Sequence, residues 1–358
     1  MQPPGEEAPA SGEEAQPLLS ARDVVQEFTV RDYGGAKGGV VHAVSGVSFD
    51  IWPGETLGIV GETGSGKSTL ARCVLQAPPP KAGAVLFRGA DLTRLRGRSL
   101  LRVRRHMQMV FQDPFGSLDP RWRVRDIVEE PLVAYRAGGR AARRRRADEV
   151  LELVGLDPGS HGGRRPRELS GGQAQRVAIA RAVALEPSLI ICDEAVSSLD
   201  VLIQAQVLNL FERLRTELGL SYLFIAHDLA LVKQVSDRVA VMYLGKLCEV
   251  GPGESVYREP RHPYTRALLD AIPGTSGSGR AAAGRPPIKG EPPSPIDPPS
   301  GCRFRTRCPR AAERCAAEEP VLRELASGHA VACHFPLEPP ATPDARPVRL
   351  GSTTTRSV

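Results

Sequence analysis

The 358-residue sequence lacks any apolar run approaching the roughly 20 residues that a membrane-spanning helix requires. Residues 1–20 are rich in proline, glycine and glutamate without an apolar segment, so we expect a disordered start and no secretory signal. Charged residues make up 25% and hydrophobic residues 41%, which is typical of soluble globular proteins. The length allows one large domain and one smaller one.

Charge and cysteine usage leave several classes of partner open. The net charge of +6 is compatible with nucleic acid, an anionic membrane face or a solvated basic surface. The seven cysteines are odd in number, and four of them lie beyond residue 300. Without an export signal, reduced thiols in a cytosol are the better interpretation.

A glycine-rich stretch, G-E-T-G-S-G-K-S, follows the apolar run Thr56–Val60 and precedes a helical pattern. Strand, loop and helix are the context that a G-x-x-x-x-G-K-[ST] phosphate loop requires. Its backbone N–H groups can cradle phosphates, Lys67 can reach the β- and γ-phosphates, and the Ser68 hydroxyl can bind Mg²⁺. The predicted nucleotide-binding residues of this loop are Gly61, Glu62, Thr63, Gly64, Ser65, Gly66, Lys67, Ser68 and Thr69.

Two alternating stretches, Ala21–Val30 and Val40–Ile51, predict antiparallel strands ahead of this core. Phe28 stands where an aromatic ring can stack on adenine; the alternative is a strand residue that faces the core. Further along, the apolar strand in M-Q-M-V-F-Q-D ends at Gln112, whose amide oxygen can reach Mg²⁺ or the attacking water. A helical region follows to about residue 155, and its basic run, Arg140–Arg146, is interpreted as a solvated helix face, with acidic lipid or nucleic acid as the alternative.

A second phosphate-directed motif, L-S-G-G-Q, lies over 100 residues after the first. Ser170 can cap the following helix, and Gly171 and Gly172 bare its N–H groups toward a phosphate, with Gln173 beside them. Two chains arranged head to tail would place each such motif over the partner's phosphate loop. Asp200, in a turn that follows the next motif, is expected to cross the dimer interface.

Two further apolar strands end in polar residues. The strand in L-I-I-C-D-E ends at Asp193, which fits an Mg²⁺-holding role, and at Glu194, which is placed to orient or deprotonate the attacking water. The strand in Y-L-F-I-A-H-D ends at His227, which can hydrogen-bond a γ-phosphate or the water. Gln112, Glu194 and His227 are therefore the predicted catalytic residues, and Ser68, Gln112 and Asp193 the predicted Mg²⁺ ligands.

With these five motifs in order, residues 20–275 resemble the ATP-binding subunits of ABC transporters. F-Q-D-P-F-G-S-L-D-P-R and R-H-P-Y-T-R-A-L-L-D-A-I-P are similar to the oligopeptide/dipeptide (and nickel) importer branch, as is the C-terminal stretch G-C-R-F-R-T-R-C-P-R-A. Ser198 departs from the commoner alanine, but the nucleotide-binding and hydrolytic residues are all present. The resemblance therefore implies a competent ATPase that powers peptide import.

The resemblance implies an α/β fold: a P-loop NTPase core with an N-terminal antiparallel β subdomain and a helical subdomain. It also implies two permease subunits, a second homologous ATPase subunit in preference to a homodimer, an external substrate-binding protein, no nucleic acid, and a peripheral place on the cytoplasmic face of the plasma (inner) membrane. The expected boundaries are 1–20 disordered, 21–275 ATP-binding domain, 276–300 linker, 301–336 cysteine-containing extension and 337–358 disordered tail.

The four late cysteines, Cys302, Cys308, Cys315 and Cys333, suggest a metal site rather than disulfides in a reduced compartment. Zinc favours closer pairs, and the wide spacing suits an iron–sulfur cluster at least as well. A [4Fe–4S] cluster is what the resemblance implies, with zinc or metal-free thiols as alternatives and His329 and His334 as alternative ligands.

The sequence is also compatible with two alternative functions, each less favoured. A soluble ABC ATPase acting on nucleic acid or ribosomes is suggested only by the basic charge, and the sequence lacks the second ATPase domain, coiled-coil insertion or zinc module usual in that class. A regulatory subunit with a dead site is disfavoured because Lys67, Gln112, Glu194 and His227 are intact. The sequence does not specify the cargo.

Overall fold

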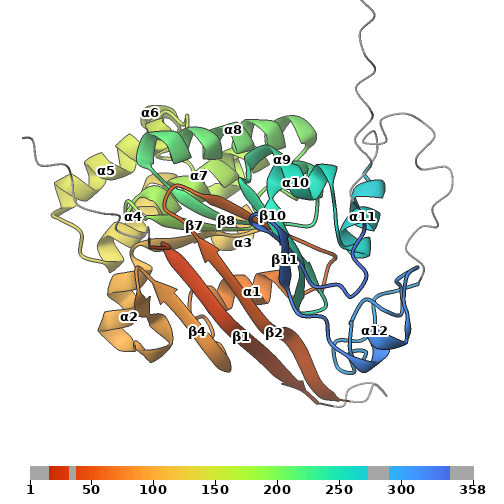
Figure 1. Cartoon of the computed structure of the whole chain (residues 1–358). Helices are drawn as coiled ribbons and strands as arrows, with labels where there is room; N and C mark the ends of the chain where they lie inside the picture. The colour runs from red at the N-terminus through yellow and green to blue at the C-terminus, as the bar shows by residue number, and fades with distance from the viewer. Residues whose placement is uncertain (1–15, 32–37, 273–289, 339–358) are drawn as a thin grey trace, which may run out of the picture.

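The computed structural model describes residues 16–31, 38–272 and 290–338. A large mixed sheet forms the centre, with a smaller antiparallel sheet on one side and helices on the other (Figure 1). This arrangement confirms the expected α/β core with its antiparallel subdomain and helical subdomain.

The large sheet has the strand order β11-β12-β10-β9-β3-β8-β7-β6. Strands β6 to β9 and β3 run parallel, and β10, β12 and β11 continue the sheet antiparallel. Every residue of β3, β7 and β8 is buried, as expected for parallel strands covered on both faces. The strands are β3 (Thr56–Val60), β6 (Met107–Val110), β7 (Leu189–Asp193), β8 (Ser221–Ala226), β9 (Arg238–Tyr243), β10 (Lys246–Pro252), β11 (Arg323–Ala326) and β12 (His329–Val331).

The small sheet has the order β2-β1-β4-β5 and is antiparallel throughout. Helix α1 (Lys67–Val74) contacts strands of both sheets, so the phosphate loop that precedes it lies where the two sheets meet. The strands are β1 (Leu19–Val30), β2 (Gly39–Ile51), β4 (Ala82–Phe87) and β5 (Ala90–Asp91); the 3-10 helix η1 (Leu92–Arg94) and helix α2 (Gly97–Arg104) follow them.

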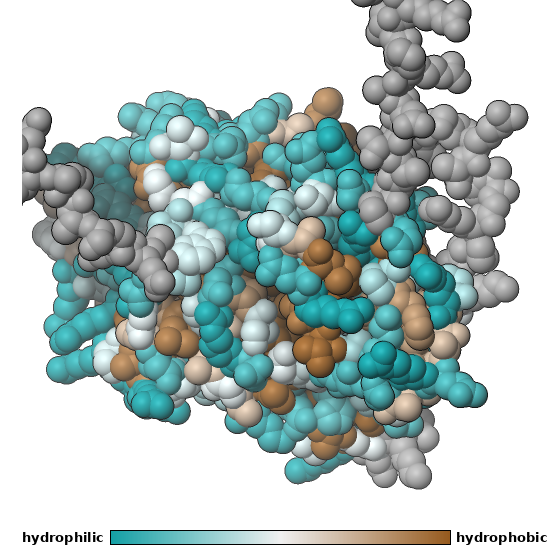
Figure 2. All heavy atoms as spheres, in the orientation of Figure 1, coloured by the Kyte–Doolittle hydropathy of each residue, from teal (hydrophilic) through white to brown (hydrophobic). Residues whose placement is uncertain are grey.

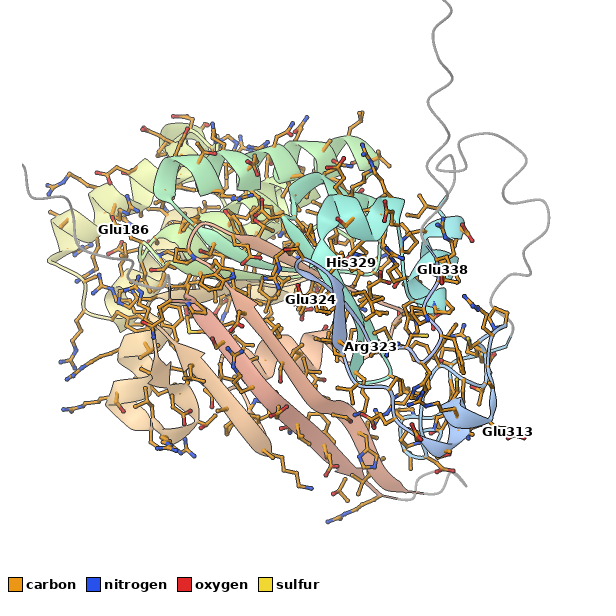
Figure 3. All side chains as sticks on the ribbon, in the orientation of Figure 1. Glu186, Glu313, Arg323, Glu324, His329 and Glu338 are labelled. Atoms are coloured by element: carbon orange, nitrogen blue, oxygen red, sulfur yellow. The ribbon has the colours of Figure 1, made fainter. Side chains whose placement is uncertain are left out.

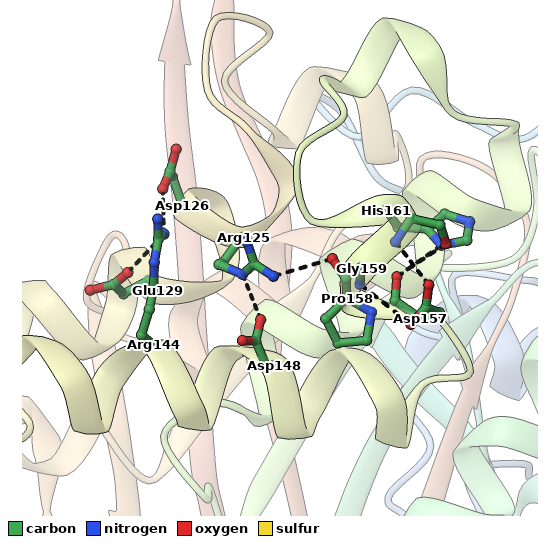
Figure 4. A network of polar contacts seen from close by, with 10 residues as sticks. Arg125, Asp126, Glu129, Arg144, Asp148, Asp157, Pro158, Gly159 and His161 are labelled. Atoms are coloured by element: carbon green, nitrogen blue, oxygen red, sulfur yellow. Dashed lines mark hydrogen bonds and ion pairs between the residues drawn. The ribbon is translucent and has the colours of Figure 1, made fainter.

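The helical subdomain packs around α7, which contacts α3, α4 and α5. Its basic run is partly neutralised within the chain: Arg144 pairs with Asp126 at 2.9 Å and with Glu129 at 3.4 Å, both on α4 (Figure 4). This compensation supports a solvated helix face. The elements are α3 (Pro114–Ser117), α4 (Val124–Ala134), α5 (Arg140–Leu153), α6 (Pro158–His161), η2 (Pro166–Glu168) and α7 (Gly171–Val183).

The remaining helices flank the large sheet or belong to the C-terminal part. The cap of α8 is Asp200, which accepts a bond from Ile203 N at 3.0 Å, and the helix ends at Gly219 in the left-handed conformation. The elements are α8 (Val201–Leu218), α9 (Leu229–Val235), α10 (Gly253–Arg258), α11 (Pro263–Asp270) and α12 (Glu313–Ala317).

Three of the expected segments differ from the structure. Strand β1 already begins at Leu19, which is fully buried, so a disordered segment reaching residue 20 is wrong at its end; residues 1–15 lie outside the described chain. The C-terminal extension is not a separate unit, because β12 pairs with β10 and extends the large sheet. The described part of the expected linker also packs on the core, since His42 N donates to Pro295 O at 2.9 Å. Residues 273–289 and 339–358 of the expected linker and tail lie outside the described residues.

Candidate functional site

The phosphate loop is built from tightly placed glycines. Gly66 has φ +102°, and a Cβ there would stand 2.0 Å from the carbonyl oxygen of Ala43. Lys67 Nζ donates to the carbonyl oxygens of Gly61 (2.8 Å) and Glu62 (3.0 Å), across the loop. Burial lowers the pKa of Lys67, opposed by the nearby carboxylates. The loop therefore holds its cation inward, where a bound phosphate would meet it.

The phosphate loop and the strand end that carries Asp193 contact each other directly. Ser68 Oγ donates to Asp193 Oδ1 at 2.7 Å, although the two residues are 125 positions apart. Asp193 is 5% exposed, and its burial raises the pKa of the carboxyl group. A hydroxyl and a carboxylate oxygen side by side are the hard donors that Mg²⁺ prefers, so this pair fits the predicted ligand role.

Three side chains from neighbouring strands gather at the same edge. Gln112 Nε2 donates to Glu194 Oε2 at 2.9 Å, and His227 Nδ1 lies 3.6 Å from the same oxygen. Gln112, Glu194 and His227 come just after β6, β7 and β8, which run parallel in adjacent register. Because the carboxyl ends of parallel strands share one edge, the fold brings these residues together. The carboxylate of Glu194, the amide of Gln112 and the imidazole of His227 therefore lie together, with Glu194 next to Asp193 in the chain.

Phe28 lies on β1, where it pairs with Val41 of β2. Its side chain is exposed (40%), so the alternative of a ring facing the core is wrong. Stacking on adenine stays a prediction. Thr63, Gly64, Ser65 and Thr69 are in or next to the loop, as expected from their positions in the motif.

The signature motif is formed but does not join the site within this chain. Ser170 Oγ accepts from Gln173 N at 3.3 Å, and Gln173 Oε1 accepts from Ser170 N at 3.0 Å, a reciprocal cap of α7. In the described chain, the side-chain hydrogen bonds of these two residues reach each other and His161, not the phosphate loop. Gly171 and Gly172 form the first turn of α7, and Asp200 caps α8 instead. Closure over a partner's nucleotide stays a prediction.

The phosphate loop has a further partner that the sequence did not reveal. Glu62 N donates to Tyr264 Oη at 2.9 Å, and its carboxylate accepts from both terminal nitrogens of Arg307, at 2.7 and 3.1 Å. Arg307 lies 245 positions away, in the C-terminal extension. A lone arginine in a basic loop carries no periodic or spacing signal, so sequence reasoning could not find this contact.

The four late cysteines line one small cavity together with His262, Phe304 and His334. All four are free thiols, and burial raises the pKa of Cys302, Cys308 and Cys333, the last to about 11. Among the described residues, no group of three or more His, Cys, Asp or Glu side chains is arranged to hold a metal ion. The convergence of four thiols fits a metal site in its donor set but not in its present geometry.

The two alternative histidine ligands behave differently. His334 borders the cysteine cavity, with Nε2 3.0 Å from the carbonyl oxygen of Glu318. His329 instead contacts the buried carboxylate of Glu249, on β10, at 2.7 Å. His329, labelled in Figure 3, lies on β12, the strand by which the extension joins the large sheet. His329 therefore has a structural partner outside the cysteine cavity.

No helix in the described ranges has both the length and the apolar character needed to cross a bilayer. Figure 2 shows one face of the molecule, where apolar side chains form patches among hydrophilic ones rather than a continuous apolar surface.

Two family models match the chain. One, "ABC transporter", matches residues 44–197, which include the phosphate loop, the signature motif and both carboxylates. The other, "Oligopeptide/dipeptide transporter, C-terminal region", matches residues 248–315, which include three of the four late cysteines.

The chain is also similar to named proteins. It is 49% identical over 320 residues to the oligopeptide transport ATP-binding protein AppF of Bacillus subtilis (strain 168), covering 89% of this chain and 97% of that protein. It is 50% identical over 295 residues to the probable peptide ABC transporter ATP-binding protein y4tS of Sinorhizobium fredii, covering 82% and 83%. Among solved structures, the dimeric post-hydrolysis ATP-binding cassette MJ0796 bound to ADP and Pi is similar with a TM-score of 0.58 and 28% identity, covering 66% of this chain and 98% of that one.

Proposed function

The chain belongs to the ATP-binding proteins of ABC transporters, within the oligopeptide/dipeptide family, and on this premise we propose that it hydrolyses MgATP to power peptide import through a membrane permease. One observation carries the proposal: Ser68 with Asp193, and Glu194 with Gln112 and His227, converge at one edge of the parallel sheet. Without these contacts the motifs would lie apart and could not act on one nucleotide.

The proposed chemistry follows from positioning and charge, since phosphoryl transfer leaves little covalent work to the protein. Lys67 and the loop amides would hold the phosphates. Ser68 and Asp193 would hold Mg²⁺, which when bound would supply positive charge beside the phosphates. Glu194 activates the attacking water and His227 contacts the γ-phosphate. The bond from Gln112 to Glu194 orients the base and leaves the amide oxygen of Gln112 for Mg²⁺ or water.

The site is completed by a second ATPase subunit. Ser170 and its neighbours do not reach the phosphate loop of their own chain, and the similar MJ0796 cassette is described as dimeric. We propose that ATP binding closes a dimer, preferably with a homologous subunit, and that hydrolysis reopens it. Two permease subunits at the cytoplasmic face of the inner membrane and an external binding protein complete the assembly.

For the four late cysteines we propose a [4Fe–4S] cluster in the cavity that they line, with zinc or free thiols as the alternatives. The raised thiol pKa values mean that a metal must displace protons on binding. Iron and sulfide analysis of protein purified without oxygen tests this. About four irons per chain with visible absorbance supports the cluster, and one zinc per chain without absorbance refutes it.

The assembly is tested by capturing tagged Glu194→Gln protein from detergent-solubilised membranes with MgATP and identifying the retained proteins by mass. The variant is expected to bind ATP but hydrolyse it slowly, so it keeps the closed assembly. Recovery of two multi-span permeases and a second ATPase supports the importer.

The matched control is Glu186→Gln, which removes a carboxylate that is 72% exposed and pairs with Arg146 of α5 rather than with a residue of the site. It should retain the same partners only weakly, because it still hydrolyses ATP. Recovery of ribosomal or DNA-bound proteins without a permease would overturn the importer in favour of the soluble alternative.

A further inference from the structure

We propose that Arg307, from the C-terminal extension, is a positioning residue for the nucleotide site, and that it acts by neutralising and fixing Glu62 of the phosphate loop. This rests on the proposed ATPase function and adds a residue that none of the five motifs contains. The contact joins segments 245 positions apart and is bidentate, at 2.7 and 3.1 Å.

The geometry of the pair is well defined. The Arg307 side chain is 8% exposed, and its guanidinium lies 5.8 Å from the centre of the Tyr243 ring and 3.3 Å from the Tyr243 hydroxyl. The planar guanidinium donates two parallel hydrogen bonds to the Glu62 carboxylate and a third to the Tyr243 hydroxyl. Arg307 is therefore held from two sides, by Tyr243 at the end of β9 and by Glu62 of the phosphate loop.

Glu62 places a negative charge in a loop that is expected to bind phosphates. Its carbonyl oxygen accepts the Lys67 ammonium at 3.0 Å, and its carboxylate is among the charges that act on that ammonium. A free carboxylate there would repel the polyphosphate that the loop binds and compete for Lys67. Arg307 cancels this charge and fixes the carboxylate, while the Tyr264 hydroxyl accepts from the backbone N of Glu62.

A second contact from the same segment reaches the loop indirectly. Arg303 donates to the carbonyl oxygen of Leu244 and to Ser45 Oγ, the latter at 3.0 Å. The neighbouring Gly245 N donates to Ser65 O in the phosphate loop at 2.8 Å. The segment between Cys302 and Cys308 thus braces the loop at two points, so its conformation bears directly on nucleotide affinity.

The test measures MgADP affinity by calorimetry and MgATP turnover on the full chain. Arg307→Ala is expected to weaken MgADP binding roughly tenfold, equivalent to about 1.4 kcal/mol. Turnover at saturating MgATP should change by less than about twofold, because the hydrolytic residues are untouched. Added salt should shrink the affinity loss, since it screens the uncompensated charge. Arg307→Lys should restore most of the affinity.

The matched control is Arg305→Ala, on the same segment, whose side chain donates to Ser300 and not to the phosphate loop. It should bind MgADP like the parent chain, whereas an equal loss would mean that the segment has simply unfolded and would overturn the proposal.

A double substitution separates the charge from general damage. Measured in the Glu62→Gln background, where the carboxylate is absent, Arg307→Ala should weaken MgADP binding by less than about twofold, compared with roughly tenfold in the parent background. An equal, roughly tenfold loss in both backgrounds would mean that Arg307 does not act through Glu62, and would overturn the proposal. Failure of the parent chain to bind MgADP would instead refute the ATPase function itself.

Discussion

Replacing His329 with alanine tests how the C-terminal extension is attached to the ATPase core. His329 is on β12, and its Nε2 lies 2.7 Å from Oε1 of Glu249 on β10, with side-chain exposures of 5% and 0%. The carboxylate also accepts from the backbone N of Arg261 at 2.7 Å and of His262 at 2.9 Å. Three donors thus satisfy one fully buried acid at the junction.

The expected loss in the free energy of unfolding depends on the hydrogen bonds that Glu249 keeps in the variant. Breaking a buried charged pair costs about 3–5 kcal/mol when the surviving charge is left alone. Here Glu249 keeps two backbone donors, so we expect a loss below that range, about 2–3 kcal/mol. At an unfolding entropy of about 2.1 cal/mol/K per residue, a 358-residue chain should show a fall in Tm of roughly 3–4 °C.

The measurement is thermal unfolding with limited trypsin digestion, compared with Val321→Ala, which changes an exposed side chain (79%) of the same extension. His329→Ala should unfold earlier and expose the arginines of the extension to trypsin, while the control matches the parent. An unchanged Tm and an unchanged digestion pattern would show that the strand pairing alone fixes the extension, and would refute the role given to this buried pair.

Three further predictions concern the site and its surroundings. Glu194→Gln should lower ATP turnover by about 10²-fold or more, the low end for lost general-base catalysis, with MgATP binding retained; near-normal turnover would remove Glu194 from that role. Gly66→Ala should abolish nucleotide binding in equilibrium titrations, because its Cβ would clash with Ala43 at a positive φ; a normal affinity would mean that the loop adapts freely. Burial lowers the pKa of His262 to about 4, so stability present above pH 6.5 should be lost as pH falls toward 4, by roughly 3 kcal/mol in total. His262→Asn, which keeps an acceptor for the α11 cap, should flatten that acid limb in pH-dependent denaturant unfolding, and an unchanged limb would assign it to another group.

The sequence located the site's elements well because each motif is contiguous. The strand in Thr56–Val60 was expected at the bounds that the structure has, since an apolar run between a Pro-Gly turn and a glycine loop leaves few alternatives. The start of β1 was misplaced because Leu18 and Leu19 follow a proline-rich stretch. The burial of Leu19 depends on its partners Ile51 and Phe87, which lie far along the chain.

The amino-acid sequence by itself determined the chemistry: a loop for phosphate, carboxylates after buried strands and a capped signature helix, because local spacing dictates each of these. Only the tertiary structure decided which of them meet. Parallel register brings Gln112, Glu194 and His227 to one edge, while the signature stays apart. It also decided that the extension joins the large sheet and that Arg307 faces Glu62, because contacts between residues 245 positions apart depend on packing and leave no local pattern.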